Sequence, residues 1–559
     1  MSNLKYLGTF PDRAPSSHPS YQSYRHINPV LKAMSRHLPQ REVEHIVNGY
    51  RRSDFSMEAL IADYFKGEVP KHHVIKDEHY RKALQVTSDL FRPKHKYRPV
   101  SFPDIRYYPW PLATSAEAPY TNSPYWRKYT RVKHALRITN DERVTFHNLY
   151  NEIFRHNREK IHRIKDGIYT DRFGQDLKYW NQAHARSHLV KADDPDKIRM
   201  VFGVPRLLIM AECMFLWPLV NDLMNRNGPM LWGFETLRGG WYATYRWLST
   251  TEPRDGTYLA FDWKQFDKRA QFSVIDDIHS IIENYIDFEH GYIPTFDYPD
   301  TTTNPNRLKS LWRWTCNAVK HTPDILPDGR MFERQHAGIA SGFFQTQLLD
   351  SMYNTVMLLT VLSKLGINID RIKIKVQGDD SLIAIPNLIP ESHFESFISM
   401  FASTALTYFG SILNEKKSKM QSHLEGLPVL GFTNHFGSPV KDAAELLANL
   451  LYPERKSDEN RLMARAVGIA YANCGYHPHV YRICEDIFTY LHGQGFSPNA
   501  AGLPHLILAL ADWRETIQVD GELKFPSYYD TIAHLNQIPK RSETQKERTW
   551  PTKQFILPY

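Results

Sequence analysis

The clearest hydrophobic pattern in the chain lies in residues 371–385. Isoleucine and valine alternate with arginine and lysine through the first half of this segment, with the period of two that is typical of a strand with one buried face. A second apolar run begins at Leu382, directly after Gly378, Asp379 and Asp380. Because so few residues separate the two runs, the pattern predicts a tight β-hairpin with two adjacent carboxylates at its tip.

Another apolar run, Thr257–Asp262, also predicts a strand, and it ends in a carboxylate. Apolar residues then recur at helical spacing from Val274 to Ile286, so Asp262 is expected where a strand gives way to a helix. Ligands in mixed folds gather at such strand ends. The competing role for Asp262, or for Asp267 five residues later, is to cap the helix.

A third segment passes from a polar loop into a helix whose apolar positions run from Phe344 to Val356. Thr346, Asp350 and Asn354 fall at positions i, i+4 and i+8, so they form a polar stripe on this helix. The stripe would face either a bound substrate or solvent, and the pattern alone does not separate the two.

Two pairs of cations stand near these elements. Lys197 and Arg199 lie two residues apart on a predicted strand, so both project from one face, where they could hold a triphosphate or form ordinary surface charge. Lys416 and Lys417 follow a predicted helix at Phe394–Phe409 and extend from a predicted turn.

The rest of the chain shows fewer chemical signals. Residues 1–150 are rich in Pro, His, Tyr and Arg, and they predict loops and short helices laid over a larger body rather than a separate domain. Within them, Tyr125–Lys133 mixes four cations with three aromatics, which suits either RNA contact or a solvated helix. The other predictions are loops at 288–330, a short hairpin at 429–437, helices at 443–451, 461–471 and 480–491, and a tail or surface strap at 540–559.

Composition narrows the class of protein. The 69 Lys and Arg against 61 Asp and Glu give a net charge of +8, which favours an anionic partner, and 13% aromatic residues argue against disorder. The four cysteines show no C-x-x-C spacing, which fits a reducing compartment. The N-terminus has no apolar stretch of signal-peptide length, and charged or polar residues interrupt the apolar tracts at 200–220 and 353–365. A membrane partner is therefore not expected.

Phosphoryl transfer to a 3′-hydroxyl would give these carboxylates a common use. Two cations about 3.5–4 Å apart acidify the attacking hydroxyl and stabilise the pyrophosphate, so carboxylates must converge on both. Asp262 and the pair Asp379 and Asp380 could supply that arrangement from distant parts of the chain, with oxygen ligands that suit Mg²⁺ or Mn²⁺. A Gly-Asp-Asp turn taken alone could equally be a solvated loop, so the hypothesis depends on the surrounding residues.

A polymerase also needs short polar side chains at the ribose, cations at the triphosphate and a proton donor for the leaving group. The candidates at the ribose are Asp267, Ser341, Thr346 and Asn354. The candidate cations are Lys197 and Arg199, and the candidate proton donors are Lys416 and Lys417.

These motifs, in this order, resemble those of viral RNA-dependent RNA polymerases, most closely the partitivirus enzymes, with the picobirnavirus enzymes near them. The matching motifs are Lys197-x-Arg199, Asp262-x₄-Asp267, Gly338-x₂-Ser341-Gly342-x₃-Thr346 with Asn354, and Gly378-Asp379-Asp380. Lys416–Lys417 resembles the general-acid region of the family, and Leu430-Gly431-Phe432 its primer-grip hairpin. The four central matches are specific when taken together.

The resemblance implies an α+β fold shaped as a right hand, with an antiparallel palm sheet flanked by helices. It implies two Mg²⁺ ions on Asp262 and Asp379, with Asp380 as a weaker third ligand, and a check for the 2′-hydroxyl by Asp267, Ser341 and Asn354. Its expected partners are template and product RNA, ribonucleoside triphosphates and the viral capsid protein, in the virion interior and the host cytoplasm.

The same resemblance divides the chain into regions. They are an N-terminal segment bridging fingers and thumb (1–150), fingers (151–255), a first part of the palm (256–290), a fingers insertion (291–335), a second part of the palm (336–440), and the thumb with the C-terminal tail (441–559).

Two alternatives stay open. A reverse transcriptase shares the paired aspartates but usually has an aromatic residue shortly before them, whereas this chain has Gln377-Gly378. A basic RNA-binding or capsid-lining protein without catalysis would fit the net charge, but it leaves the two carboxylate sites unexplained.

Overall fold

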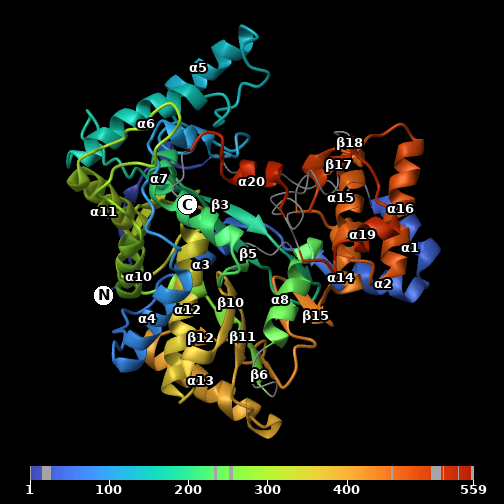
Figure 1. Ribbon diagram of the computed structural model, residues 1–559. Helices are drawn as coiled ribbons and strands as arrows, with labels where there is room; N and C mark the ends of the chain where they lie inside the picture. The colour runs from blue at the N-terminus through green and yellow to red at the C-terminus, as the bar shows by residue number, and fades with distance from the viewer. Residues whose placement is uncertain are drawn as a thin grey trace.

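The computed structural model describes residues 2–15, 27–231, 236–250, 256–454, 457–504, 518–519, 522–538 and 541–555. Helices and several small sheets are mixed along the chain, and the predicted α+β class is confirmed (Figure 1).

The central sheet contains the predicted hairpin. β10 (Lys373–Gln377) and β11 (Asp380–Ile385) pair antiparallel, and β6 (Thr257–Ala260) and β13 (Lys419–Gln421) complete the order β10-β11-β6-β13. The predicted hairpin and the predicted strand at β6 are confirmed. The pairing of β11 with β6 was not predicted, because it joins segments more than a hundred residues apart.

Both faces of this sheet are buried. Leu259 and Ile383, which pair across β6 and β11, belong to the largest hydrophobic core. Tyr258 and Ala384, which are the next pair, belong to a second core on the opposite face. The helices that contribute to the first core beside the sheet are α10 (Phe272–Tyr285), α12 (Thr346–Lys364) and α13 (Phe394–Phe409).

A five-stranded sheet lies above the central one in Figure 1, and it includes the start of the chain. Its order is β1 (Leu4–Thr9), β9 (Arg330–Arg334), β8 (Asp324–Ile325), β3 (Asn181–Ser187) and β5 (Ile198–Gly203). The predicted strand for Lys197 and Arg199 is β5, although Lys197 stands one residue before it.

Two helices from the N-terminal part of the chain pack on three helices from its C-terminal part. α1 (Ile27–His37) and α2 (Gln40–Gly49) share a hydrophobic core with α14 (Ala443–Leu451), α15 (Glu459–Ala472) and α16 (Pro478–Gly493). α14, α15 and α16 match the three helices predicted at 443–451, 461–471 and 480–491. In the tail, α20 (Glu543–Thr549) is followed by Trp550 and Phe555, whose rings pack on Trp217, so this part is a strap.

Two expectations are wrong in detail. Residues 288–330 contain a helix, α11 (Pro305–His321), rather than loops alone. Asn304 and Pro305 are punctuation that suggests a loop, yet here Asn304 caps the helix and Pro305 occupies its first turn.

The strand that ends near Asp262 also does not lead directly into a long helix. β7 (Trp263–Lys264) and α9 (Phe266–Arg269) intervene before α10. β7 forms because β12 (Ile412–Leu413), far along the chain, pairs with it.

α7 (Arg206–Asn225) is the one helix of the described ranges that is long and apolar enough to cross a membrane, and 72% of its most apolar window is buried inside the protein. It is therefore a core helix of this fold.

The remaining elements cover the outside or connect the sheets. The helices are α3 (Met57–Phe65), α4 (Glu78–Phe91), α5 (Pro124–Ala135), α6 (Tyr150–Lys165), α8 (Gly240–Ser249) and α19 (Tyr528–Ile532). The strands are β2 (Tyr50–Arg52), β4 (Leu189–Lys191), β14 (Pro428–Val429), β15 (Phe432–His435), β16 (Ser438–Val440), β17 (Gln518–Val519) and β18 (Glu522–Leu523). β14 and β15 confirm the hairpin predicted at 429–437.

Candidate active site

The turn of the β10–β11 hairpin is held by α12. Gly378 has a φ of 65°, and its N–H donates to Ser351 Oγ at 2.8 Å. The Asn354 amide donates to the carbonyl oxygens of Gly378 and Asp379, both at 3.0 Å, and its Oδ1 accepts from the Trp263 indole at 3.1 Å. These contacts fix the backbone that carries Asp379.

The polar stripe on α12 is therefore divided between two roles. Asn354 is fully buried and lies under the turn, which differs from the expectation that it faces a substrate. Asp350, one turn earlier, has a buried Oδ1 for which the described residues provide no hydrogen-bond partner. Burial raises the pKa of Asp350 well above its ordinary value, and the charges of Asp267 and Asp379 raise it further, so Asp350 lies beside both. The sequence pattern places Asp350 in the stripe, facing either a substrate or solvent, and does not distinguish its role from that of Asn354.

Asp262 lies beside the same turn. Ile383 of β11 pairs with Leu259 of β6, so Asp380, three residues before Ile383, and Asp262, three residues after Leu259, lie at the same end of the two neighbouring strands. Asp262 and Asp380 also line one cavity, so the carboxylates from the two distant segments converge.

The pKa shifts record this convergence. Burial raises the pKa of Asp380 to about 6, and the charges of Asp379 and Asp262 contribute to the rise. Burial also raises the pKa of Asp379, with Asp267 and Asp262 adding to the effect and Arg199 opposing it. A group of carboxylates this close, with hard oxygen donors, fits a divalent cation that would neutralise it.

The turn that contains the two lysines is tied to Asp262. Asn414 donates from its amide side chain to Asp262 Oδ2 and from its backbone N–H to the Asp262 carbonyl, each at 2.7 Å. Ser418 Oγ accepts from the Asp262 N–H at 3.2 Å. Between these anchors, Lys416 and Lys417 are exposed and line a cavity of about 390 Å³ together with Asp262 and Asp380.

Leu430 and Gly431, in the hairpin that resembles the primer grip, line the same cavity. The Leu430 backbone also forms a hydrogen bond to Asp380, which lowers the pKa of that carboxylate against the larger effect of burial.

The loop before α12 lies against β5. Gly342 has a φ of 105°, and a Cβ added there would stand 2.3 Å from the Phe202 carbonyl oxygen, so only glycine fits without a shift of the loop. Thr346 Oγ1 donates to the Ala340 carbonyl at 2.9 Å, which closes the loop. Ser341 Oγ is buried and has no hydrogen-bond partner in the part of the chain that the structure describes, so it is available to bind a ligand.

The two cations before the site interact electrostatically with its carboxylates. Burial lowers the pKa of Lys197, and the charges of Arg199 and Lys417 lower it further, while Asp262 and Asp379 oppose the shift. Lys197 is therefore within electrostatic reach of both the metal-site carboxylates and the lysine turn.

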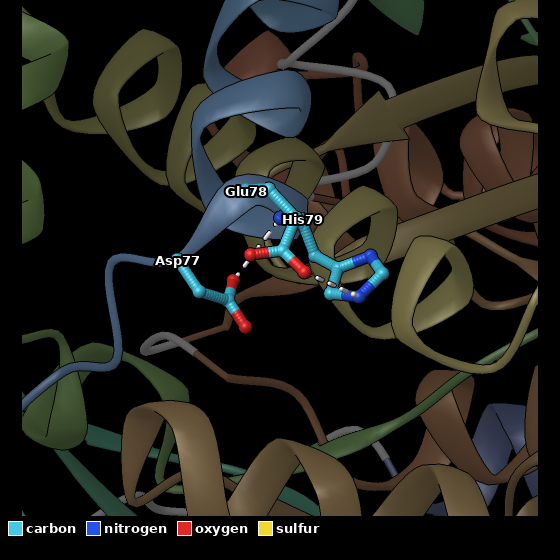
Figure 2. Close-up of side chains that lie close together, drawn as sticks. All are labelled: Asp77, Glu78 and His79. Atoms are coloured by element: carbon cyan, nitrogen blue, oxygen red, sulfur yellow. Dashed lines mark hydrogen bonds and ion pairs between the residues drawn. The ribbon is translucent and has the colours of Figure 1, made fainter.

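A separate acidic cluster does not resemble a metal site. Asp77, Glu78 and His79 lie together at the start of α4 (Figure 2). Asp77 accepts from the backbone N–H groups of His79 and Tyr80, and from the Tyr408 hydroxyl at 2.5 Å. These bonds make Asp77 the N-cap of α4, which accounts for the cluster.

Carboxylates at adjacent strand ends, cations beside them and a lysine turn at the edge of the cavity are typical of enzymes that transfer nucleotidyl groups with divalent metal ions. A family model for viral RNA-dependent RNA polymerases matches residues 40–486. The RNA-directed RNA polymerase of White clover cryptic virus 1 (isolate Boccardo/2004) is 32% identical over 605 aligned positions, which cover 99% of this chain and 96% of the relative. That of Atkinsonella hypoxylon virus (isolate 2H) is 28% identical over 511 positions, which cover 83% and 75%.

The chain thus belongs to the viral RNA-dependent RNA polymerases, and the resemblance noted in the sequence is confirmed. It is a nucleotidyltransferase that uses an RNA template and ribonucleotide substrates, and its family uses divalent metal ions and has the right-hand fold. The comparisons therefore favour the RNA polymerase over both alternatives, the reverse transcriptase and the non-catalytic RNA-binding protein.

Proposed function

We propose that the enzyme joins nucleotides by a two-metal mechanism with Mg²⁺, and that Mn²⁺ can replace it. Asp262 and Asp379 would be the principal ligands and Asp380 a weaker third. When bound, the ions would acidify the 3′-hydroxyl and neutralise the charge of the leaving pyrophosphate. The observation that supports this most directly is the cavity that Asp262 and Asp380 line together, at the ends of the neighbouring strands β6 and β11.

The neighbouring residues would bind the incoming nucleotide. Lys197 and Arg199 would hold the triphosphate, since both act electrostatically on the carboxylate site. Asp267, Ser341, Gly342 and Thr346 would form the ribose pocket. We assign direct ribose contact to Asp350 in place of Asn354, because Asp350 has a free oxygen and Asn354 uses its amide within the protein.

Lys417 is the better candidate for the general acid. Both lysines line the cavity, but the charge of Lys417 acts on Lys197, which we place at the triphosphate. A protonated amine at that position would donate to the leaving pyrophosphate.

The regions of the hand would follow the packing. The β10-β11-β6-β13 sheet would be the centre of the palm, within residues 256–290 and 336–440. Fingers would be formed by 151–255 and 291–335, and the thumb by the helices after residue 441. Residues 1–150 would bridge the two, since β1 joins β9 and α1 and α2 pack on the C-terminal helices.

The viral relatives support a role in transcription and genome replication, with template and product RNA as partners. We further propose that the enzyme works inside the virion, next to the capsid protein, and in the host cytoplasm.

The test is RNA synthesis by purified Asp262→Asn and Asp379→Asn variants. Each should lose at least about a thousandfold in rate, or about 4 kcal/mol, because a metal ligand is removed, while RNA affinity is retained. Asp370→Asn, at an exposed carboxylate paired with Lys82, is the matched control and should polymerise normally. Near-normal synthesis by either site variant would contradict the mechanism.

A further inference from the structure

A buried carboxylate outside the metal site holds the loop that we place at the ribose. Glu212, in the middle of α7, is 1% exposed. Burial raises its pKa to about 7, and in the described part of the chain no cation pairs with it. A buried carboxylate without a counter-charge destabilises the fold unless hydrogen bonds satisfy it. The groups that donate hydrogen bonds to Glu212 should therefore explain why it is buried.

Those neighbours are three N–H groups at the end of the Ser341–Thr346 loop. Glu212 Oε2 accepts from the Phe344 backbone N–H at 2.8 Å. Glu212 Oε1 accepts from the Gln345 side-chain amide at 2.8 Å and, more weakly, from the Gln345 backbone N–H at 3.4 Å. Gln345 precedes the first residue of α12, so the carboxylate also stands at the N-terminal end of the helix, where negative charge is favoured.

The Gln345 side chain is itself held in one orientation. His279 Nε2 lies 2.7 Å from Gln345 Oε1, and burial lowers the pKa of His279 to about 4, so the ring is neutral. Gln345 already donates to Glu212 from its nitrogen, and its oxygen must therefore accept from His279 Nε2–H. Among the described residues His279 Nδ1 has no partner, which fits this tautomer.

The start and middle of the loop are anchored elsewhere. The Ile339 N–H donates to the Asp267 carbonyl at 2.7 Å, and Gly342 is pressed against Phe202 at the end of β5. Two residues, Val204 and Pro205, separate β5 from α7. One continuous segment of chain therefore carries Arg199 and also Glu212.

We propose that Glu212 is a positioning residue for nucleotide selection. It fixes the C-terminal end of the loop against α7, so that the Ser341 hydroxyl and the first turns of α12 keep a set distance from the cations of β5. This inference rests on the proposed role of the loop at the ribose.

Glu212→Gln tests the inference, because it preserves the shape of the side chain but turns one acceptor oxygen into an N–H donor that faces other donors. We expect the KM for ribonucleotides to rise about tenfold, and the preference for ribonucleotides over deoxyribonucleotides to fall by a similar factor, as for the removal of one hydrogen bond to a charged group. The kcat with saturating ribonucleotide and the affinity for RNA should change less than about threefold.

Asp104→Asn is the matched control. Asp104 is also a buried carboxyl, but its side-chain bond is to Ser101 and not to the Ser341–Thr346 loop. It should alter the melting temperature without altering the choice of sugar. If Glu212→Gln changes only the melting temperature, as the control does, the positioning role is overturned.

Ser341→Ala separates this inference from the proposed function. Loss of sugar discrimination in Ser341→Ala but not in Glu212→Gln would overturn the role of Glu212 alone, and loss in neither would overturn both. If Glu212→Gln does not fold, Gln345→Met decides: it keeps both backbone bonds to Glu212, and discrimination should still fall by about threefold, or the inference fails.

Discussion

Asp350 and Asn354 lie one helical turn apart on α12, and their surroundings predict opposite mutant phenotypes. Asp350→Ala removes a carboxylate with a free oxygen beside Asp267, so the KM for ribonucleotides should rise and sugar discrimination should fall. Asn354→Ala removes two bonds to the metal-site turn and leaves the Trp263 indole unsatisfied. It should cost about 1–3 kcal/mol of stability and lower kcat.

Steady-state kinetics and thermal unfolding of the two variants check this prediction. If both variants changed mainly the KM for ribonucleotides, or both changed mainly the stability, Asp350 and Asn354 would not have the different roles proposed.

Lys416 and Lys417 are adjacent, and only one can be suitably aimed at the leaving pyrophosphate. Lys417→Ala should slow single-nucleotide addition by about a hundredfold, within the usual range for general acid catalysis, whereas Lys416→Ala should stay within a few-fold of wild type. Pre-steady-state addition of one nucleotide measures the step directly. Equal and near-normal rates would remove the general-acid role, and the reverse order would move it to Lys416.

At the scale of elements, two glycines with positive φ should respond differently to alanine. Gly342→Ala puts a Cβ 2.3 Å from a backbone oxygen of β5, which cannot move without disturbing the sheet. Gly378→Ala meets only the end of the flexible Gln347 side chain, at 2.9 Å. Gly378→Ala should therefore cost about 1 kcal/mol of conformational strain, and Gly342→Ala about 3 kcal/mol or more together with most of the activity. Chemical denaturation of both variants ranks them, and equal destabilisation would count against the close approach of loop and strand.

The elements also show what a sequence pattern can predict. The β10–β11 hairpin and α13 follow from local periodicity because each is stabilised by its own spacing of apolar residues. β7 does not, because two residues become a strand only when β12 supplies a partner. The motif residues of the site can be recognised because each motif is a short stretch of neighbouring residues that resembles a motif of a known family. The roles of Asp350 and Glu212 depend on contacts between distant segments, and no local pattern contains these.

At the scale of the whole molecule, the basic segment Tyr125–Lys133 forms most of α5, which projects from the top of the view in Figure 1, away from the metal-site hairpin. The described residues offer no carboxylate partner to Arg127, Lys128 and Arg131 of this helix or to Arg137, two residues after its end, and all four are exposed. Tyr125 is 65% exposed and stacks on Tyr129. This combination suits the phosphates and bases of RNA outside the catalytic cavity.

Replacement of these four cations by glutamine should weaken binding of long single-stranded RNA and reduce the slope of log affinity against log salt by roughly 0.7 for each phosphate that the protein no longer neutralises. Addition of one nucleotide to a short, preassembled primer–template should not change, because the metal site is elsewhere. Lys5, Lys32, Lys71 and Lys94, which are also exposed, provide a control with the same change in net charge. Net charge alone would affect both variants equally. A larger change of slope in the variant of α5 and Arg137 would therefore assign RNA contact to this region. Equal slopes would contradict RNA binding there.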